Sequence, residues 1–262
     1  MTQSSPHVAA ENDSPGWRPW LVYVAPFAIY MLLNTLEPGP PDPAKPDAQA
    51  AAPGGILAIP YQYYPLVYTI KIAVTAAFLI AVARDLARLS WRVSPRAIGV
   101  GIVGVAVWIG ICELHLEERL LAPLGLASYL GLGARAAYNP LAELGDRPLL
   151  AYTFLAVRFL GLVVIVPIVE ELFWRGFLMR FITDQRWWTL PLVAVSWTGV
   201  AVATAAFASA HPAELLAAIA WFSLVTWLMF RTQNLTDCVV AHGTTNLLLG
   251  LYVVATGSWR YW

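Results

Sequence analysis

Long apolar segments separated by shorter polar ones dominate the sequence. A helix needs about 20 mostly apolar residues to cross the hydrocarbon core of a bilayer. The segments with this pattern are Trp20–Leu36, Tyr63–Ala83, Ala97–Cys112, Leu149–Ile182, Leu190–Ala210, Leu215–Phe230 and Cys238–Thr256. A chain that crosses lipid in this way satisfies its backbone hydrogen bonds within each helix. We therefore expect an all-α fold, a polytopic transmembrane helix bundle with seven or eight spans.

The segment Leu149–Ile182 is longer than a bilayer requires. At 1.5 Å per residue it would extend about 51 Å, against a hydrocarbon core of about 30 Å. It contains Pro167, which cannot donate a hydrogen bond to the Val163 carbonyl. We expect this helix either to break or kink near Pro167, which would admit water to the bundle, or to project beyond the membrane.

The polar segments divide the chain. Residues 1–16 form a polar tail without the basic start of a signal peptide, so residues 17–262 are predicted to be one membrane domain. Glu37–Gly55 has the composition of a Pro/Ala/Gly linker, and the short apolar run Leu120–Ala134 is expected at the membrane interface. Arginines concentrate in three loops, at positions Arg84, Arg88, Arg92 and Arg96, then Arg175, Arg180 and Arg186, then Arg231. Because basic loops stay on the cytoplasmic side, the N-terminus is predicted to be cytoplasmic.

Composition agrees with a membrane protein. The chain of 262 residues is 59% hydrophobic and 12% charged, whereas soluble domains have about 25% charged residues. Sixteen basic and sixteen acidic residues cancel, and no basic patch with interleaved aromatics indicates a nucleic-acid partner. The two cysteines, Cys112 and Cys238, lie too far apart for a disulfide framework or a CxxC metal site.

A few ionisable residues lie within or beside the apolar segments. They are Lys71, Arg158, Glu170, Glu171, Arg175, His211, Glu214 and His242. A charge at the bilayer centre costs at least about 2.5–3.5 kcal/mol, so such residues usually face the bundle interior and have partners. Glu171 and Arg175 are four positions apart and can form an ion pair on one helix face. Glu170 is rotated by about 100° from Glu171 and therefore addresses something else.

Two histidines and an asparagine complete the polar set. His242 and Asn246 are also four positions apart, and His211 ends an apolar segment just before Pro212. A carboxylate that accepts a proton and imidazole or amide groups that hold a metal ion or a water are the parts of a hydrolytic site. Straight helices would place the two histidines at different depths, because His211 follows Leu190 by about 30 Å of helix. A tilt, a break at Pro212 or a partial span must bring them together.

Three motifs carry a resemblance to a known family. "EELFWR" has the form EExxxR, "FASAH" has the form FxxxH, and "HGTTN" has the form HxxxN. In this order they resemble the CPBP intramembrane proteases, which include the CAAX prenyl endopeptidase called Ras-converting enzyme and bacterial relatives. The match runs from about Gly161 to Leu251, within a motif-bearing core at residues 149–256.

The resemblance implies a site inside a bundle of eight helices. The residues it assigns to catalysis are Glu170, Glu171, Arg175, His211, His242 and Asn246. Glu170 would be the general base that activates water, with Glu171 and Arg175 as its supports. His211, His242 and Asn246 would coordinate a zinc ion or, in a competing view, hold the water and the oxyanion without metal. Asparagine is an uncommon zinc ligand, and the HExxH motif is absent from the sequence.

The implied protein is a CAAX-protease-like intramembrane metalloendopeptidase. It would cleave a membrane-tethered, hydrophobic or lipid-anchored peptide, with membrane lipid as its other partner. High alanine content, arginine in preference to lysine and the lack of a targeting signal fit the inner membrane of a bacterium.

Three other readings remain open. A non-catalytic membrane binding or immunity protein could use the same fold, with the polar residues fixing helix packing. A serine protease would use Ser196, Ser209 or Ser223, but no motif of that class surrounds them. A transporter would use Lys71 and Arg158, which more commonly snorkel or pair, and no inverted repeat is visible.

Overall fold

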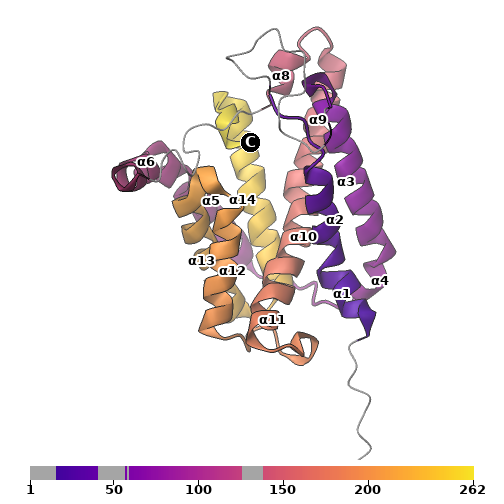
Figure 1. The fold of residues 1–262 in the computed structure, drawn as a ribbon, viewed down its shortest axis with the longest axis vertical. Coiled ribbons are helices and arrows are strands. Elements are labelled where there is room, and N and C mark those ends of the chain that lie inside the picture. The colour runs from indigo at the N-terminus through magenta and orange to yellow at the C-terminus, as the bar shows by residue number, and fades with distance from the viewer. Residues whose placement is uncertain (1–15, 41–56, 58, 126–137) are drawn as a thin grey trace, which may run out of the picture.

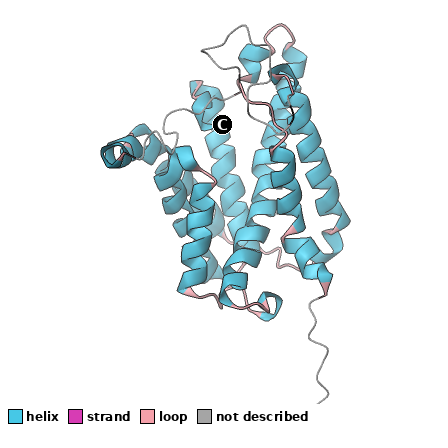
Figure 2. Cartoon of the chain, in the orientation of Figure 1, coloured by secondary structure: helices cyan, strands magenta, loops and turns pink. Residues whose placement is uncertain are grey.

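The computed structural model describes residues 16–40, 57, 59–125 and 138–262. All regular elements in this part of the chain are helical (Figure 1, Figure 2). The helical stretches that are long and apolar enough to cross a membrane are Tyr61–Ala81, Pro95–Glu113, Pro148–Thr183, Pro212–Thr232 and Leu235–Thr256. Two further predicted spans correspond to shorter apolar helices, Ala25–Asn34 and Trp197–Ser209. The all-helical membrane fold is confirmed, while the predicted count of seven or eight spans is not.

The elements before the long central helix are α1 (Trp17–Tyr23), α2 (Ala25–Asn34), η1 (Tyr61–Tyr63), α3 (Tyr64–Ala81), α4 (Ala83–Leu86), α5 (Pro95–Glu113), α6 (Leu116–Leu121), η2 (Ala122–Leu124) and α8 (Pro140–Glu143). Those after it are η5 (Trp187–Thr189), α12 (Trp197–Ser209), η6 (Pro212–Glu214), α13 (Leu215–Thr232), α14 (Leu235–Thr256) and η7 (Trp259–Tyr261). Most of the predicted tail, linker and interfacial run lies outside the described residues.

The helices form two groups that meet along the centre of the molecule (Figure 1). In one group α2 packs on α3, and α3 packs on α9 (Pro148–Leu160). In the other group α5 packs against both α13 and α14, and α12 packs on α13. Helix α14 also contacts α10 (Val166–Glu171) of the central helix. The polar residues of the three motifs are therefore carried by helices that meet at the junction of the two groups.

Residues Pro148–Thr183 form one uninterrupted helical rod. It consists of α9 (Pro148–Leu160), the π-helical turn η3 (Gly161–Ile165), α10 (Val166–Glu171), the π-helical segment η4 (Leu172–Leu178) and α11 (Met179–Thr183). The predicted break at Pro167 does not occur, because the turn just before the proline widens to the π register. Such turns are rare and often occur at functional sites. Here they flank both glutamates.

The π-helical turn η3 also changes which backbone groups lack partners. The Val166 amide donates to the Gly161 carbonyl, five residues back. The next carbonyl, that of Leu162, would need a donor at position 167 in this register, and proline has no amide hydrogen. In this register the carbonyl that the proline leaves without a backbone donor is that of Leu162, one position before the Val163 carbonyl that a regular α-helix predicts.

The predicted span Leu190–Ala210 is wrong in its first part. Residues 190–196 are not helical, and α12 starts only at Trp197. Its 13 residues extend about 20 Å, so His211 lies less deep than a full span would place it. A neighbouring contact holds the start of the next helix, since Glu117 Oε1 accepts the Leu216 amide at 2.7 Å and the Ala217 amide at 3.3 Å. This cap fixes α13 directly after the loop that carries His211.

Candidate active site

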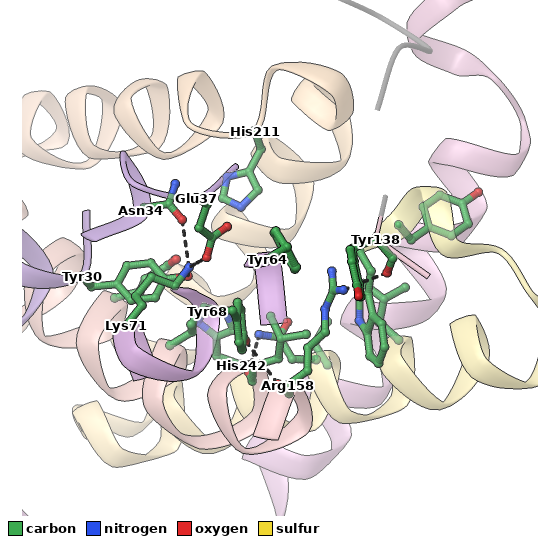
Figure 3. A pocket seen from close by; sticks show the side chains of 18 of the residues that line it. Tyr30, Asn34, Glu37, Tyr64, Tyr68, Lys71, Tyr138, Arg158, His211 and His242 are labelled. Atoms are coloured by element: carbon green, nitrogen blue, oxygen red, sulfur yellow. Dashed lines mark hydrogen bonds and ion pairs between the residues drawn. The ribbon is translucent and has the colours of Figure 1, made fainter. Parts of the chain in front are cut away.

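One cavity of about 440 Å³ lies between the two helix groups (Figure 3). Its walls come from α2, α3, α5, α9, α10, α12, α13 and α14, with residues of the short segments next to them. Among the predicted site residues, those that line it are Glu170, His211, His242 and Asn246. The other two, Glu171 and Arg175, are fully buried behind this wall. The fold thus brings together all six predicted residues, four around the cavity and two in support.

Glu171 and Arg175 form the ion pair predicted from their spacing. The Arg175 guanidinium binds Glu171 Oε2 through Nη1, and both side chains are inaccessible to solvent. Arg175 Nη2 also donates to the Phe222 carbonyl at 3.0 Å and to Thr226 Oγ1 at 3.3 Å. The pair therefore ties the central rod to α13, as expected for buried charges that need several partners.

Glu170 faces the cavity instead of Arg175. It is half-buried, and Trp174 Nε1 donates to its Oε2 at 3.4 Å. Trp174 follows Glu170 by four positions, just as Arg175 follows Glu171, so the motif forms two parallel contacts on neighbouring helix faces. Only one of the two carboxylates is matched by a cation from its own helix, and the other is left beside open space.

His242 links α14 to the buried ion pair. Its Nδ1 lies 3.0 Å from Glu171 Oε1. Its ring packs edge-to-face on Trp221, with the two ring centroids 4.6 Å apart. A carboxylate only accepts hydrogen bonds, so Nδ1 carries the hydrogen and Nε2 is the nitrogen that remains for chemistry. Carboxylates that orient histidines in this way are common around catalytic imidazoles. Glu171 therefore holds both Arg175 and His242.

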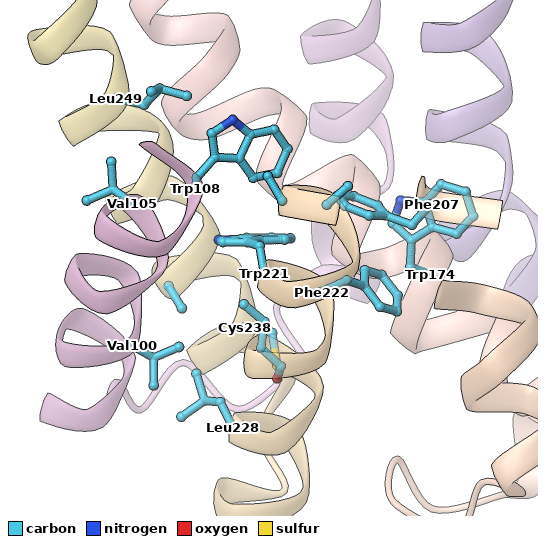
Figure 4. Close-up of a cluster of buried hydrophobic side chains, with 14 of the residues drawn as sticks. Val100, Val105, Trp108, Trp174, Phe207, Trp221, Phe222, Leu228, Cys238 and Leu249 are labelled. Atoms are coloured by element: carbon cyan, nitrogen blue, oxygen red, sulfur yellow. The ribbon is translucent and has the colours of Figure 1, made fainter. Parts of the chain in front are cut away.

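His211 is oriented by its own helix end. Its Nδ1 lies 2.9 Å from the Phe207 carbonyl, and its ring packs 4.5 Å from the Phe207 ring and 5.8 Å from that of Trp108. Because a carbonyl is an acceptor, Nδ1 again carries the hydrogen. The Phe207 ring in turn packs against those of Trp221, Phe222 and Trp174 (Figure 4).

Asn246 supports the π-helical turn. Its Nδ2 donates at 2.8 Å to the Leu162 carbonyl, the group that Pro167 leaves without a backbone donor. One face of the turn is held close to α14 by Gly243, where a Cβ atom would lie 2.6 Å from the Val163 carbonyl oxygen. The asparagine thus locks α14 to the rod next to Glu170, while its Oδ1 remains as an acceptor.

The Asn246→Asp variant separates this role from metal ligation. A carboxylate cannot donate to the Leu162 carbonyl, so we expect a loss of about 1–3 kcal/mol of stability for an unsatisfied buried group, together with reduced activity. Thermal unfolding in detergent and peptide turnover would measure both effects. Asn246→Gln keeps the donor as a control, and an aspartate variant with wild-type stability would contradict the role in helix packing.

The residues around the cavity do not form a recognisable zinc site. In the described part of the chain, no three His, Cys, Asp or Glu side chains are grouped so as to hold a metal ion. Each histidine donates from Nδ1, to Glu171 and to the Phe207 carbonyl, which is the usual orientation of metal-ligating histidines and does not argue against zinc. The implied set of His211, His242 and Asn246 also lacks the third strong ligand that catalytic zinc ordinarily has. Zinc therefore stays a prediction, and no step below depends on it.

Other cavity residues were not assigned to the site from sequence. Lys71 is buried and forms an ion pair with Glu37, and its Nζ also donates to Asn34 Oδ1 at 2.9 Å. It therefore pairs, as the sequence predicted. Arg158 lines the same cavity and donates to the Tyr138 carbonyl at 3.0 Å. Trp174 was missed although its spacing from Glu170 is visible in the sequence. The remaining contacts join segments far apart in the chain and leave no local signal.

These features define a class of protein, a helical membrane protein with a carboxylate and two imidazoles around an internal cavity. Residues 152–248 match the model of a family described as Type II CAAX prenyl endopeptidase Rce1-like. This range contains all three motifs, so the predicted resemblance to the CAAX proteases is confirmed for this region of the chain. The family indicates a CAAX protease-type enzyme. No curated protein and no solved structure gives a significant match.

Proposed function

We propose that this protein hydrolyses a peptide bond of a membrane-tethered or hydrophobic peptide with a water molecule activated by Glu170. The observation that carries the proposal is the division of labour between the two glutamates. Glu171 is neutralised by Arg175 and hydrogen-bonded to His242, whereas Glu170 lines the cavity that His211 and His242 share. A packing network alone would not need a carboxylate beside open space, which argues against the non-catalytic alternative.

The reaction requires few groups. Water attacks the scissile carbonyl as Glu170 takes its proton, so that a C–O bond forms and the carbonyl oxygen becomes an oxyanion. Glu170 then returns the proton to the leaving amine as the C–N bond breaks. The Nε2 atoms of His211 and His242 can accept a hydrogen bond from the water or, when protonated, donate one to the oxyanion. Both rings are already held in place, which lowers the cost of reaching the transition state.

The substrate and setting follow from the fold. The cavity lies among apolar helices, so a hydrophobic or lipid-anchored peptide is the proposed substrate, and membrane lipid is the surrounding partner. We also propose that the protein lies in a bacterial inner membrane, as its composition indicates. Its N-terminus is proposed to be cytoplasmic, because the arginine-rich loops predict this orientation. Reporter fusions at each terminus would test the orientation.

The test is cleavage of a panel of fluorogenic hydrophobic peptides by the purified protein in detergent. We expect turnover to be lost in the His211→Ala and His242→Ala variants, with circular dichroism showing that each variant is still folded. Unchanged turnover in both variants would contradict the proposed site. Absence of turnover across the panel, with a folded wild type, would favour the non-catalytic alternative.

Metal removal is a separate prediction. If zinc is bound as the resemblance implies, metal analysis should find about one zinc per chain, and a chelator should abolish turnover until zinc is restored. The His242→Ala variant should then contain less metal than wild type. Full turnover by protein freed of metal would remove zinc from the mechanism and leave the role of Glu170 intact.

A further inference from the structure

A second cavity, of about 270 Å³, lies at the end of the bundle where the central rod finishes. Arg180 lines it and follows Glu170 by ten positions on the rod, which corresponds to about 15 Å along the axis. Among the described residues, none lines both this cavity and the one that contains Glu170. Helices α1, α4 and α11 lie at this same end of the molecule (Figure 1). The second cavity is therefore separate from the proposed catalytic site.

The lining of the second cavity carries positive charge without a matching acid. Its charged members among the described residues are Arg88 and Arg180. The other lining residues are neutral, and they are Tyr23, Leu89, Ser90, Gly176, Leu192, Gln233, Asn234 and Leu235. A cleft lined by charge of one sign concentrates the opposite ion, because its low-dielectric walls focus the field. The lining therefore favours an anionic ligand.

Arg180 is the buried cation of this cavity, with 8% exposure. Its Nη1 donates to the Gly176 carbonyl at 2.8 Å and its Nη2 to the Leu190 carbonyl at 2.6 Å. Its Nε is buried and has no hydrogen-bond partner among the described residues. No carboxylate of the described residues pairs with it, whereas Arg175 on the same rod has Glu171. A buried cation held only by neutral carbonyls still requires a counter-ion.

Arg88 is the exposed cation of the same cavity, with 76% side-chain exposure. Its Nη1 lies 3.7 Å from Asp85 Oδ1, and Arg18 Nη2 lies 3.7 Å from the other oxygen of that carboxylate. One carboxylate thus serves two arginines at the long end of ion-pair distance. Exposed pairs of this kind contribute little to stability. Arg88 can therefore turn toward a ligand at the mouth of the cavity at little cost.

The position of the cavity favours a lipid as the source of the anion. Trp17 at the start of α1 and Trp91 beside the turn that carries Arg88 are both exposed. Exposed tryptophans are typical of the boundary between membrane and water. The arginines at this end predict that it faces the cytoplasm, where the membrane surface is rich in anionic lipids. The leucines of the lining can contact the glycerol and the first carbons of the acyl chains.

We propose that this cavity binds the phosphate group of an anionic phospholipid, with Arg180 inside the cavity and Arg88 at its mouth. Guanidinium groups bind phosphate through parallel, charge-assisted hydrogen bonds. Basic pockets between helices on the cytoplasmic side of membrane proteins recognise lipid headgroups in this way. The bound lipid would join α1, the rod and the turn before α14, and so stabilise the bundle. The inference does not depend on the proposed hydrolysis.

Native mass spectrometry of the full chain, released from detergent micelles, can count bound lipids. The probes are dioleoyl phosphatidylglycerol, dioleoyl phosphatidylcholine and inorganic phosphate, each titrated separately at constant ionic strength. We expect one phosphatidylglycerol site that binds about 10-fold or more tightly than the other two probes. Arg180→Gln should weaken this binding by about 10-fold, and Arg88→Gln by about 5-fold. Arg180→Lys should retain more binding than Arg180→Gln, because it keeps the charge.

The matched control is Arg84→Gln, which removes an exposed arginine of α4 that does not line the cavity and should bind phosphatidylglycerol as the wild type does. Binding that is unchanged in both cavity variants, or equal for the two lipids, would overturn the inference. If Arg180→Gln does not fold, Arg88→Gln and the comparison of lipids still decide. Inorganic phosphate that binds as tightly as phosphatidylglycerol, with the same dependence on Arg88, would overturn the lipid assignment and indicate a soluble phosphate ligand.

Thermal unfolding in detergent gives a second readout. A ligand that binds only the folded protein raises its unfolding temperature. Phosphatidylglycerol should therefore raise the unfolding temperature of the wild type and of Arg84→Gln more than that of Arg88→Gln. An equal rise in all three proteins would show that the lipid acts elsewhere on the surface and would contradict the proposed site.

Discussion

The Glu170→Gln variant should lose about 10²–10⁴-fold in kcat for peptide hydrolysis, the contribution expected of a positioned general base. The amide has the same shape and can still accept the hydrogen bond from Trp174, but it cannot take a proton from water. The cavity and its lining should therefore persist while the chemical step fails. Turnover of a fluorogenic hydrophobic peptide, measured at saturating substrate, would give the value directly.

A matched control is available on the surface. Glu143 lies on α8, is exposed and does not line the cavity, so Glu143→Gln makes the same chemical change outside the lining and should keep wild-type turnover. Unfolding temperatures of both variants should stay close to that of wild type. A folded Glu170→Gln protein with more than half of the wild-type kcat would contradict the assignment of the base.

The Arg175→Met variant should be the most destabilised single substitution at the site. Glu171 is fully buried, and removing its main cation leaves a charge without adequate compensation. Breaking a buried ion pair in this way costs about 3–5 kcal/mol. The substitution also removes the hydrogen bonds to the Phe222 carbonyl and Thr226 that join the rod to α13. Denaturant titration in detergent, followed by tryptophan fluorescence, would measure the loss.

The double variant Glu171→Gln with Arg175→Met provides the critical comparison. It removes the charge that Arg175→Met leaves exposed to apolar surroundings, so it should be more stable than the Arg175→Met single variant. Arg147→Met serves as the surface control and should change stability by less than about 0.5 kcal/mol. An Arg175→Met protein as stable as wild type would show that the pair is not a structural support.

Local spacing was sufficient to predict part of the site. The interval of four residues predicts the contact between Glu171 and Arg175, and the one-residue offset predicts that Glu170 points elsewhere. Both hold in the structure. The same rule would also have identified Trp174 as the neighbour of Glu170. Helical periodicity is decisive here because the residues share one helix.

Contacts between helices could not be predicted in this way. Glu171 and His242 are 71 positions apart, and Asn246 meets the Leu162 carbonyl across 84 positions. That second contact depends on the π register before Pro167, which hydropathy does not encode. The late start of α12 is equally hidden, since residues 190–196 are as apolar as a helix would be. Tertiary packing, not local preference, decides these features.

Lys71 and Arg158, which both line the cavity, illustrate the same limit. Sequence alone indicates that Lys71 and Arg158 snorkel or pair, and the structure shows that only Lys71 has a carboxylate partner among the described residues. The difference arises because Glu37, near the end of α2, reaches Lys71 but not Arg158. Such pairing is set by the packing of α2 on α3 and is not visible in either segment.

In the proposed reaction, water activated by Glu170 attacks the peptide bond directly. Mass spectrometry of the products formed in H₂¹⁸O with hydroxylamine present tests this step most directly. We expect every new C-terminus to be a carboxylate carrying one ¹⁸O atom and Glu170→Gln to yield none. A C-terminal hydroxamate would reveal an acyl-enzyme intermediate and thus a side-chain nucleophile, which would contradict direct attack by water.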